Sequence, residues 1–242
     1  MKTKIILFSI ILLSFQPILA QTKDSIHGPM LSGTAPSFKA ISTLGDINFP
    51  DDYFGKWKIL FSHPADFTPV CTTEILALAA IQDDFKNLNT ALIGISTDGL
   101  NSHMEWIKSM DSLSINGSKK VNVEFPLISD VDLKISKLYG IVQLDSTGNK
   151  DVRGVYIIDP DNKIRAFFYY PKTVGRNMDE IKRTLIALQT EDKHNVLIPA
   201  NWKPGDEVLI HSPKTIKDAQ KLEAKKDSKL REITWYMWFK KL

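Results

Sequence analysis

The sequence has very little cysteine: Cys71 is the single cysteine among 242 residues. A chain with one cysteine cannot form an internal disulfide. A lone cysteine is then either a buried structural side chain or one that is kept for its reactivity. The surroundings of Cys71 therefore decide which function the sequence indicates.

Clusters of positive charge are also missing. The formal net charge is only +3, and the lysines and arginines are spread along the chain without a basic block. Nucleic-acid-binding domains normally concentrate this charge on one face or in one segment. We therefore expect no nucleic-acid partner.

The patterns that hold metals and nucleotides are absent as well. Gly94-Ile95-Ser96 follows a predicted strand but lacks the later glycines and the lysine of a phosphate-binding loop. The histidines are scattered without the spacing of metal ligands. They are His27, His63, His103, His194 and His211. The sequence predicts neither a metal site nor a cofactor.

Long apolar runs are confined to the first twenty residues. Lys2 and Lys4 precede the apolar run Ile5–Phe15, Pro17 interrupts it, and Ala20 stands at a plausible cleavage point. This order is typical of a secretory signal peptide over 1–20. The alternative, a membrane anchor, would need a run of about 20 apolar residues. We expect a chain exported to the periplasm or secreted, with no membrane span.

What remains is a normal globular composition, with 43% hydrophobic residues, which excludes disorder. Apolar runs of strand length occur at Trp57–Ser62 and Ala91–Ser96, and helical apolar stripes occur between the predicted strands. Pro160-Asp161-Asn162 separates two further strand patterns as a hairpin turn. Strands alternating with helices predict an α/β fold with a mixed central sheet flanked by helices.

The helical patterns and the domain limits can be placed approximately. Helices are predicted over Thr72–Leu88, Ser102–Met110, Asp130–Tyr139 and Met178–Gln189, with Asp130 and Asn177 as the N-caps of the last two. The composition changes near residue 192, and Ser212-Pro213 then opens a charged helix that is expected to reach Leu230. We expect a flexible segment over 21–31, a main domain over 32–191 and a small C-terminal domain over 192–242.

The loop before Cys71 favours a reactive side chain. It follows a buried strand, is stiffened by Pro64 and Pro69, and opens a helix, so Cys71 is expected in the first helical turn. Free amides and the helix dipole stabilise an anion there, and the thiolate is the reactive form of cysteine. Thr68 offers a hydroxyl to the same space, which can donate to the sulfur, and Pro64 can shield the sulfur without adding a donor.

Two charged residues elsewhere can complete such a site. Arg153 opens a distant strand of the same sheet, where its permanent cation can face Cys71. Glu74 lies one turn after Cys71 and can hold that guanidinium by a bidentate pair.

The spacing Pro64-x-x-x-Thr68-x-x-Cys71, within SHPADFTPVCTTE, resembles the active-site signature of peroxiredoxins, and the flanking residues resemble the one-cysteine class. About residues 32–212 are similar to the family. The further similar segments are GTAPSF, ISTDGLNSHMEWI, RGVYIIDPDNKIR, YPKTVGRNMDEI and IPANWKPGD.

The resemblance implies a thioredoxin-like domain followed by the C-terminal peroxiredoxin domain. Cys71 would attack the O–O bond of hydrogen peroxide or an organic hydroperoxide and become a sulfenic acid. Thr68 and Arg153 would polarise the peroxide, and Arg176 would support the pocket. His63 matches a pocket histidine, although an ordinary histidine at a strand end is the alternative. Members of this class form homodimers and sometimes larger rings.

Two departures from related patterns limit the expected activity. The chain has no second cysteine that could resolve the oxidised one, so recycling requires an external thiol or another external reductant. The pentapeptide Gly-x-Ser-x-Gly of a phospholipase site is absent, and the corresponding stretch is Phe54-Gly55-Lys56-Trp57-Lys58.

Two other functions remain open at this point. Oxidation of Cys71 can serve an exported redox sensor or a chaperone-like oligomer in place of turnover. The tail Trp235–Lys241 can bind a membrane surface, because aromatic residues followed by lysines suit that interface. The alternative for the tail is packing against the C-terminal domain or a partner subunit.

Overall fold

The computed structural model describes residues 28–113, 122–145, 148–225 and 227–242. The predicted signal peptide and most of the segment 21–31 lie outside these residues. Within the described part of the chain, no helix is long and apolar enough to cross a membrane.

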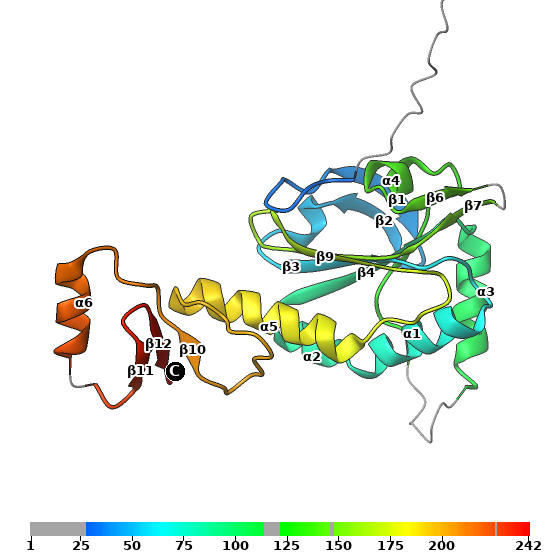
Figure 1. Ribbon diagram of the computed structural model, residues 1–242. Helices are drawn as coiled ribbons and strands as arrows, with labels where there is room; N and C mark the ends of the chain where they lie inside the picture. Colours follow the sequence, from blue (N-terminus) through cyan, green and yellow to red (C-terminus); the bar gives the residue numbers. More distant parts are fainter. Residues whose placement is uncertain (1–27, 114–121, 146–147, 226) are drawn as a thin grey trace, which may run out of the picture.

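A seven-stranded mixed sheet forms the centre of the main domain (Figure 1). In spatial order its strands are β2 (Gly45–Phe49), β1 (Phe38–Ser42), β5 (Leu127–Ser129), β4 (Thr90–Ser96), β3 (Trp57–Ser62), β8 (Arg153–Ile158) and β9 (Ile164–Tyr170). The pairs β3–β4 and β4–β5 are parallel, whereas β8 is antiparallel to both β3 and β9. The predicted mixed sheet is confirmed.

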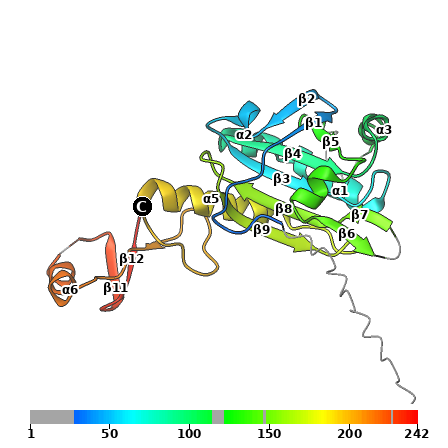
Figure 2. The ribbon, with the colours of Figure 1, turned by 90° about the horizontal axis from the view of Figure 1, so that it is seen from above.

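Helices lie on both faces of this sheet, as Figures 1 and 2 show. They are α1 (Pro69–Ala80), α2 (Gln82–Asn87), α3 (Leu100–Met110), α4 (Lys134–Leu138) and α5 (Met178–His194), with a short 3-10 helix at Asp51–Tyr53. Since side chains alternate along a strand, Ile59 and Phe61 join the core under α1 and α5, whereas Leu60 joins the core on the other face with Tyr139. Every residue of β3 is buried, including Lys58 and Ser62, which explains why its other four residues are apolar.

The observed helices of the main domain differ in extent from the predicted ones. The stripe over 72–88 is two helices, α1 and α2, separated at Ile81. The helix predicted from Asp130 begins only at Lys134, because the Asp130 carboxylate accepts hydrogen bonds from the amides of Ile135 and Ser136. A hairpin that the sequence analysis did not predict, β6 (Val142–Asp145) and β7 (Gly148–Asp151), follows α4. The helix α5 begins after Asn177 as predicted, with the Asn177 side chain accepting from the amide of Glu180.

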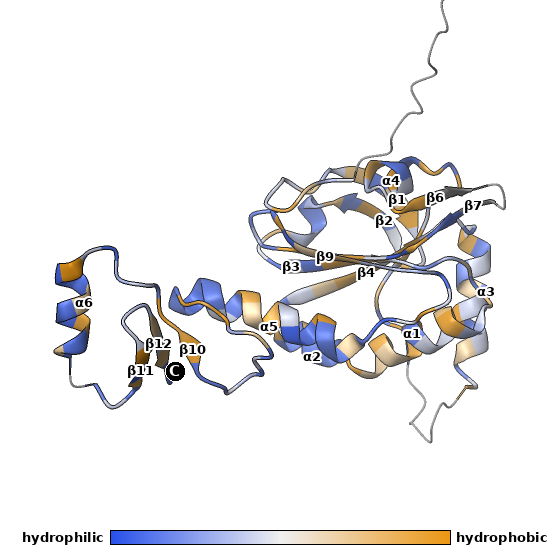
Figure 3. Ribbon diagram, viewed as in Figure 1, coloured by the Kyte–Doolittle hydropathy of each residue, from blue (hydrophilic) through white to orange (hydrophobic). Residues whose placement is uncertain are grey.

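The C-terminal part forms a separate small unit beyond the end of α5 (Figures 1 and 3). It contains β10 (Val208–Leu209), α6 (Ile216–Glu223), β11 (Leu230–Thr234) and β12 (Met237–Lys240). The predicted helix reaching Leu230 is therefore too long. The observed helix α6 ends at Glu223, and Leu230 begins β11, which pairs with β12.

The aromatic tail takes part in this small sheet. The strand β12 is its central strand and pairs with both β10 and β11. Trp238 is buried, while Trp235 and Tyr236 remain more than half exposed. Packing of the tail against the C-terminal unit thus accounts for Trp238, and the two exposed rings stay available for a partner.

Candidate active site

Cys71 lies where the sequence predicts it, in the first turn of α1. Pro69 occupies the first helical position, where a missing N–H costs nothing. The backbone amide of Thr72 donates to the carbonyl oxygen of Thr68 and closes the first turn. The Cys71 side chain is completely buried, so the sulfur faces fixed protein groups and not bulk water.

Arg153 is the cation in contact with the sulfur. Its Nη1 donates to Sγ of Cys71 over 3.3 Å and to Oε2 of Glu74 over 2.7 Å. Its Nε and Nη2 both donate to the carbonyl oxygen of Lys172. Strand β8, which begins at Arg153, pairs with β3, and this pairing brings the guanidinium to a cysteine that is 82 residues earlier.

Glu74 holds two arginines, not one. Its carboxylate accepts from Nε and Nη2 of Arg176 at 3.0 and 2.8 Å, and from the Arg176 backbone amide at 2.8 Å. The expected bidentate pair with Arg153 is therefore wrong: the bidentate partner is Arg176, and Arg153 contributes one bond. Nη1 of Arg176 donates to the carbonyl oxygens of Ser62 and Gly154, which fixes this guanidinium to both β3 and β8.

This buried group of Glu74, Arg153 and Arg176 carries a net positive charge. Glu74, Arg153 and Arg176 are each at most 7% exposed, and burial lowers the pKa of Arg176 while Glu74 acts in the opposite direction. Two guanidinium groups and one carboxylate leave one positive charge. Arg153 carries part of this positive charge and contacts Sγ of Cys71, so it can stabilise negative charge that develops there during a reaction.

The loop residues Pro64 and Thr68 lie between β3 and α1, just before Cys71. Pro64 is buried and Thr68 is half-buried. The Thr68 hydroxyl donates to the carbonyl oxygen of Ala65 over 2.8 Å, not to the sulfur as expected. Because its proton is used there, the oxygen keeps its lone pairs as acceptors.

The structure also brings His63 and His103, which are far apart in the sequence, into contact with one carboxylate, that of Asp66. His63 is fully buried after β3, and its Nε2 lies 2.9 Å from Oδ1 of Asp66. His103, in α3, is fully buried too, with Nδ1 2.8 Å from Oδ2 of the same carboxylate. The two histidines are thus not scattered. Their separation of 40 residues gave no ligand-like spacing, so the sequence alone gave no sign that Asp66 and His103 would meet.

A thioredoxin-like sheet with a buried cysteine at a helix start, beside an arginine fixed by a glutamate, defines a thiol-dependent peroxidase, which is an oxidoreductase. The comparisons with known proteins agree. Residues 32–167 match the AhpC/TSA family, and residues 187–225 match the C-terminal domain of 1-Cys peroxiredoxin. The chain belongs to the peroxiredoxin family.

The matches to individual relatives extend over nearly the whole length of each relative. A peroxiredoxin of Methanosarcina mazei is 46% identical over 214 residues, which cover 88% of this chain and 98% of the relative. The yeast mitochondrial 1-Cys peroxiredoxin structure has a TM-score of 0.77 at 41% identity, covering 88% of this chain and 99% of that one. The Peroxiredoxin 6 of Arenicola marina has a TM-score of 0.77 at 33% identity, covering 89% and 99%. The predicted thioredoxin-like fold with a C-terminal peroxiredoxin domain is confirmed.

Proposed function

We propose that this peroxiredoxin reduces hydrogen peroxide and organic hydroperoxides at Cys71 through a sulfenic acid, and that an external thiol restores it. The observation that carries the proposal is the 3.3 Å contact between Nη1 of Arg153 and Sγ of Cys71, with Glu74 holding the guanidinium in place. A fixed cation at this distance favours the thiolate and is already oriented toward charge that develops on the peroxide.

The reaction follows from these groups. The Cys71 thiolate attacks one peroxide oxygen, the S–O bond forms as the O–O bond breaks, and the electron pair leaves with the second oxygen. Arg153 donates hydrogen bonds to the developing charge, and Thr68 accepts from the peroxide O–H through its free lone pairs. The leaving oxygen takes a proton to become water or an alcohol. One external thiol then forms a mixed disulfide with release of water, and a second thiol releases reduced Cys71.

The proposal also includes the kind of reductant, the oligomeric state and the export of the protein. The yeast relative's structure concerns thiol resolution through glutathione and thioredoxin systems, and thiols of these two kinds are the reductants we propose here. A homodimer is supported by β9, which ends the seven-stranded sheet and exposes Phe167 and Tyr169. Export is supported by Lys2, Lys4 and the Ile5–Phe15 run.

Steady-state peroxide consumption tests the proposed function. The purified protein is given hydrogen peroxide or an alkyl hydroperoxide together with thioredoxin, glutathione or a simple dithiol. Many turnovers per Cys71 with at least one reductant are expected. A single equivalent of peroxide consumed under every condition would instead indicate a redox sensor or a chaperone-like oligomer.

Removing either polar group from the peroxide should slow the oxidation of Cys71. Thr68→Val and Arg153→Met are each expected to lower the rate constant for sulfenic acid formation by about a hundredfold, the usual cost of one transition-state donor or acceptor. Competition against a reference peroxidase measures this rate.

Matched controls separate chemistry from general perturbation. Thr73→Val removes an exposed hydroxyl that donates to the Val70 carbonyl in the same way as Thr68 donates to that of Ala65. Arg231→Met removes a half-exposed arginine of the C-terminal unit. Both controls should react like wild type, and an unchanged rate in Thr68→Val or Arg153→Met would remove that residue from the site.

Peroxide alone should add oxygen atoms to the protein one at a time. One equivalent is expected to add one oxygen as sulfenic acid, and excess peroxide a second as sulfinic acid, because no second cysteine intervenes. Intact-mass spectrometry follows both steps. Since Cys71 is completely buried, a dimer linked through two Cys71 residues should be minor, and such a dimer as the main product would contradict the closed site.

A further inference from the structure

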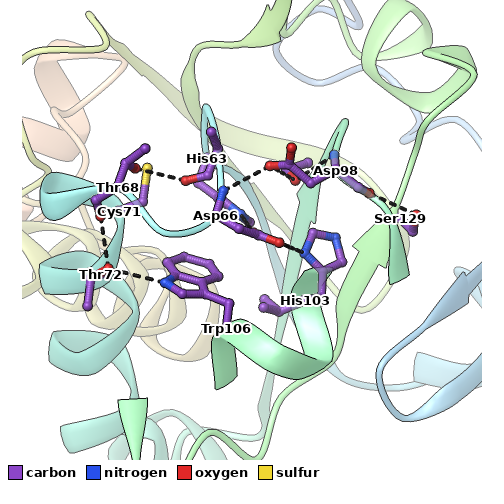
Figure 4. A network of polar contacts seen from close by, with 12 residues as sticks. His63, Asp66, Thr68, Cys71, Thr72, Asp98, His103, Trp106 and Ser129 are labelled. Carbon is purple, nitrogen blue, oxygen red and sulfur yellow. Dashed lines mark hydrogen bonds and ion pairs between the residues drawn. The ribbon is translucent and has the colours of Figure 1, made fainter. Parts of the chain in front are cut away.

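Beside the arginine pair lies a second buried polar group, formed by His63, Asp66 and His103. Figure 4 shows this network extending from His103 through Asp66 to the loop that carries Thr68 and Cys71. His63 and His103 are completely buried and Asp66 is 7% exposed. The backbone amide of Asp66 donates to the carboxylate of Asp98 over 2.8 Å, which fixes the loop at this point.

The hydrogen bonds of His103 determine its protonation. Nε2 lies 3.1 Å from the carbonyl oxygen of Ile128, which can only accept, so Nε2 carries a proton. Nδ1 lies 2.8 Å from Oδ2 of Asp66. Burial tends to raise the pKa of Asp66, but the hydrogen bonds from His103 and His63 hold it well below its usual range. The carboxylate is ionised and can only accept, so Nδ1 of His103 also carries a proton and the ring is an imidazolium.

His63 is in the opposite state. Its Nε2 donates to Oδ1 of Asp66 over 2.9 Å. Burial lowers the pKa of His63, and the positive groups His103 and Arg176 act in the same direction, against the effect of Asp66. The ring is therefore neutral with its proton on Nε2. Nδ1 is bare, buried and without a hydrogen-bond partner among the described residues.

The ring of His63 is also fixed in orientation. It packs against Trp106 with centroids 5.0 Å apart. Nε1 of Trp106 donates to the Thr72 hydroxyl, which donates in turn to the carbonyl oxygen of Thr68. The histidine is thus connected to the first turn of α1, where Cys71 lies.

We propose that His103 and Asp66 are positioning residues, a buried ion pair that fixes His63 as its Nε2–H tautomer and so keeps Nδ1 as an unprotonated acceptor at the start of the loop that leads to Cys71. The O–H of a hydroperoxide is the donor that this nitrogen suits. The inference rests on the proposed peroxidase function for its kinetic consequence, but the protonation states themselves do not depend on it.

A metal ion is the competing interpretation, because the ligand atoms of the three side chains lie within 4.8 Å of one another. Two facts favour the ion pair. The facing atoms already form hydrogen bonds of 2.8 to 3.0 Å with each other, and the atom that lacks a partner, Nδ1 of His63, is not one of those facing atoms.

The protonation states can be read directly in the wild-type protein. Long-range ¹H–¹⁵N correlation spectra of the histidine rings distinguish protonated from bare nitrogens, with assignment by His63→Gln and His103→Gln. One doubly protonated ring, His103, and one Nε2–H ring, His63, are expected. A neutral His103, a proton on Nδ1 of His63, or one equivalent of metal in protein purified without chelator would overturn the proposal.

The kinetic test uses His103→Gln, which removes the cation but keeps a hydrogen-bonding side chain. Without the imidazolium, burial should raise the pKa of Asp66, so that it binds a proton as the pH falls and no longer fixes His63. The rate of Cys71 oxidation relative to wild type should then fall about tenfold between about pH 8 and about pH 5. The exposed histidine variant His211→Gln should track wild type at every pH.

The outcomes distinguish this inference from the proposed function. A wild-type protein that consumes no peroxide would refute the function, while the spectra would still test the ion pair. A variant rate that keeps a constant ratio to wild type across the pH range, in a protein that does consume peroxide, would refute the positioning role alone.

Discussion

Cys71→Ser is expected to abolish peroxide consumption completely while leaving the fold intact. The chain has no second sulfur that could replace the first. A serine hydroxyl does not ionise near neutral pH, so Arg153 would face a weak neutral nucleophile in place of a thiolate. The measurement is peroxide loss with each reductant that supports turnover by the wild-type protein.

The result has to be separated from a loss of structure. Serine is slightly smaller than cysteine and fits the same completely buried position. The urea midpoint of the variant should therefore stay near that of wild type, and its mass should not change with peroxide. Residual turnover in a folded Cys71→Ser protein would show that the peroxidase chemistry occurs elsewhere.

Glu74→Gln is expected to have the largest effect on stability. The change keeps the size of the side chain but removes the charge that pairs with both Arg153 and Arg176. It leaves two buried guanidinium groups without their carboxylate and turns one of its oxygens into a donor that faces other donors. Loss of one partner of a buried ion pair typically costs about 3–5 kcal/mol. Urea denaturation followed by tryptophan fluorescence measures the free energy of unfolding.

An exposed ion pair provides the control for this variant. Glu105 pairs with Lys108 on the surface of α3, with both side chains about two-thirds exposed. Since exposed pairs contribute about 0.2–1 kcal/mol, Glu105→Gln should stay close to wild type. Equal stabilities of Glu74→Gln and Glu105→Gln would show that the arginines do not depend on Glu74. The rate of sulfenic acid formation should also fall in Glu74→Gln, because Arg153 loses a contact that orients it.

The two variants test different properties of the same site. Cys71→Ser changes the reacting atom and should leave the free energy of unfolding nearly unchanged. Glu74→Gln leaves the reacting atom in place and should change both stability and rate. If the site is built as described, the two changes separate the chemistry at the sulfur from the charged framework around it.

The local features of this protein could be predicted from the sequence. Trp57–Ser62 is apolar at four of its six positions and forms β3, which is buried throughout. Pro64, Thr68 and Cys71 are close in sequence, so their common loop and the helix start at Pro69 follow from local rules. Asn177 before the helical stripe of α5 was recognisable for the same reason. These features depend on neighbours within a few residues.

The distant pairings were decided by the tertiary structure. That Glu74 gives its bidentate pair to Arg176 depends on how the segment after β9 returns to α1, and no spacing in the sequence specifies this. The C-terminal helix was expected to reach Leu230, but Leu230 begins β11, which pairs with β12.

His63 and His103 illustrate the limit most clearly. Each looks like an isolated histidine in the sequence, and contact between α3 and the loop that follows β3 brings both to one carboxylate, Asp66. Their protonation states then follow from which neighbours can only accept a hydrogen bond. The sequence by itself determined the nucleophile and its loop, because these are local. Only the fold decided the charged groups around them, because burial and contact across the sheet set those interactions.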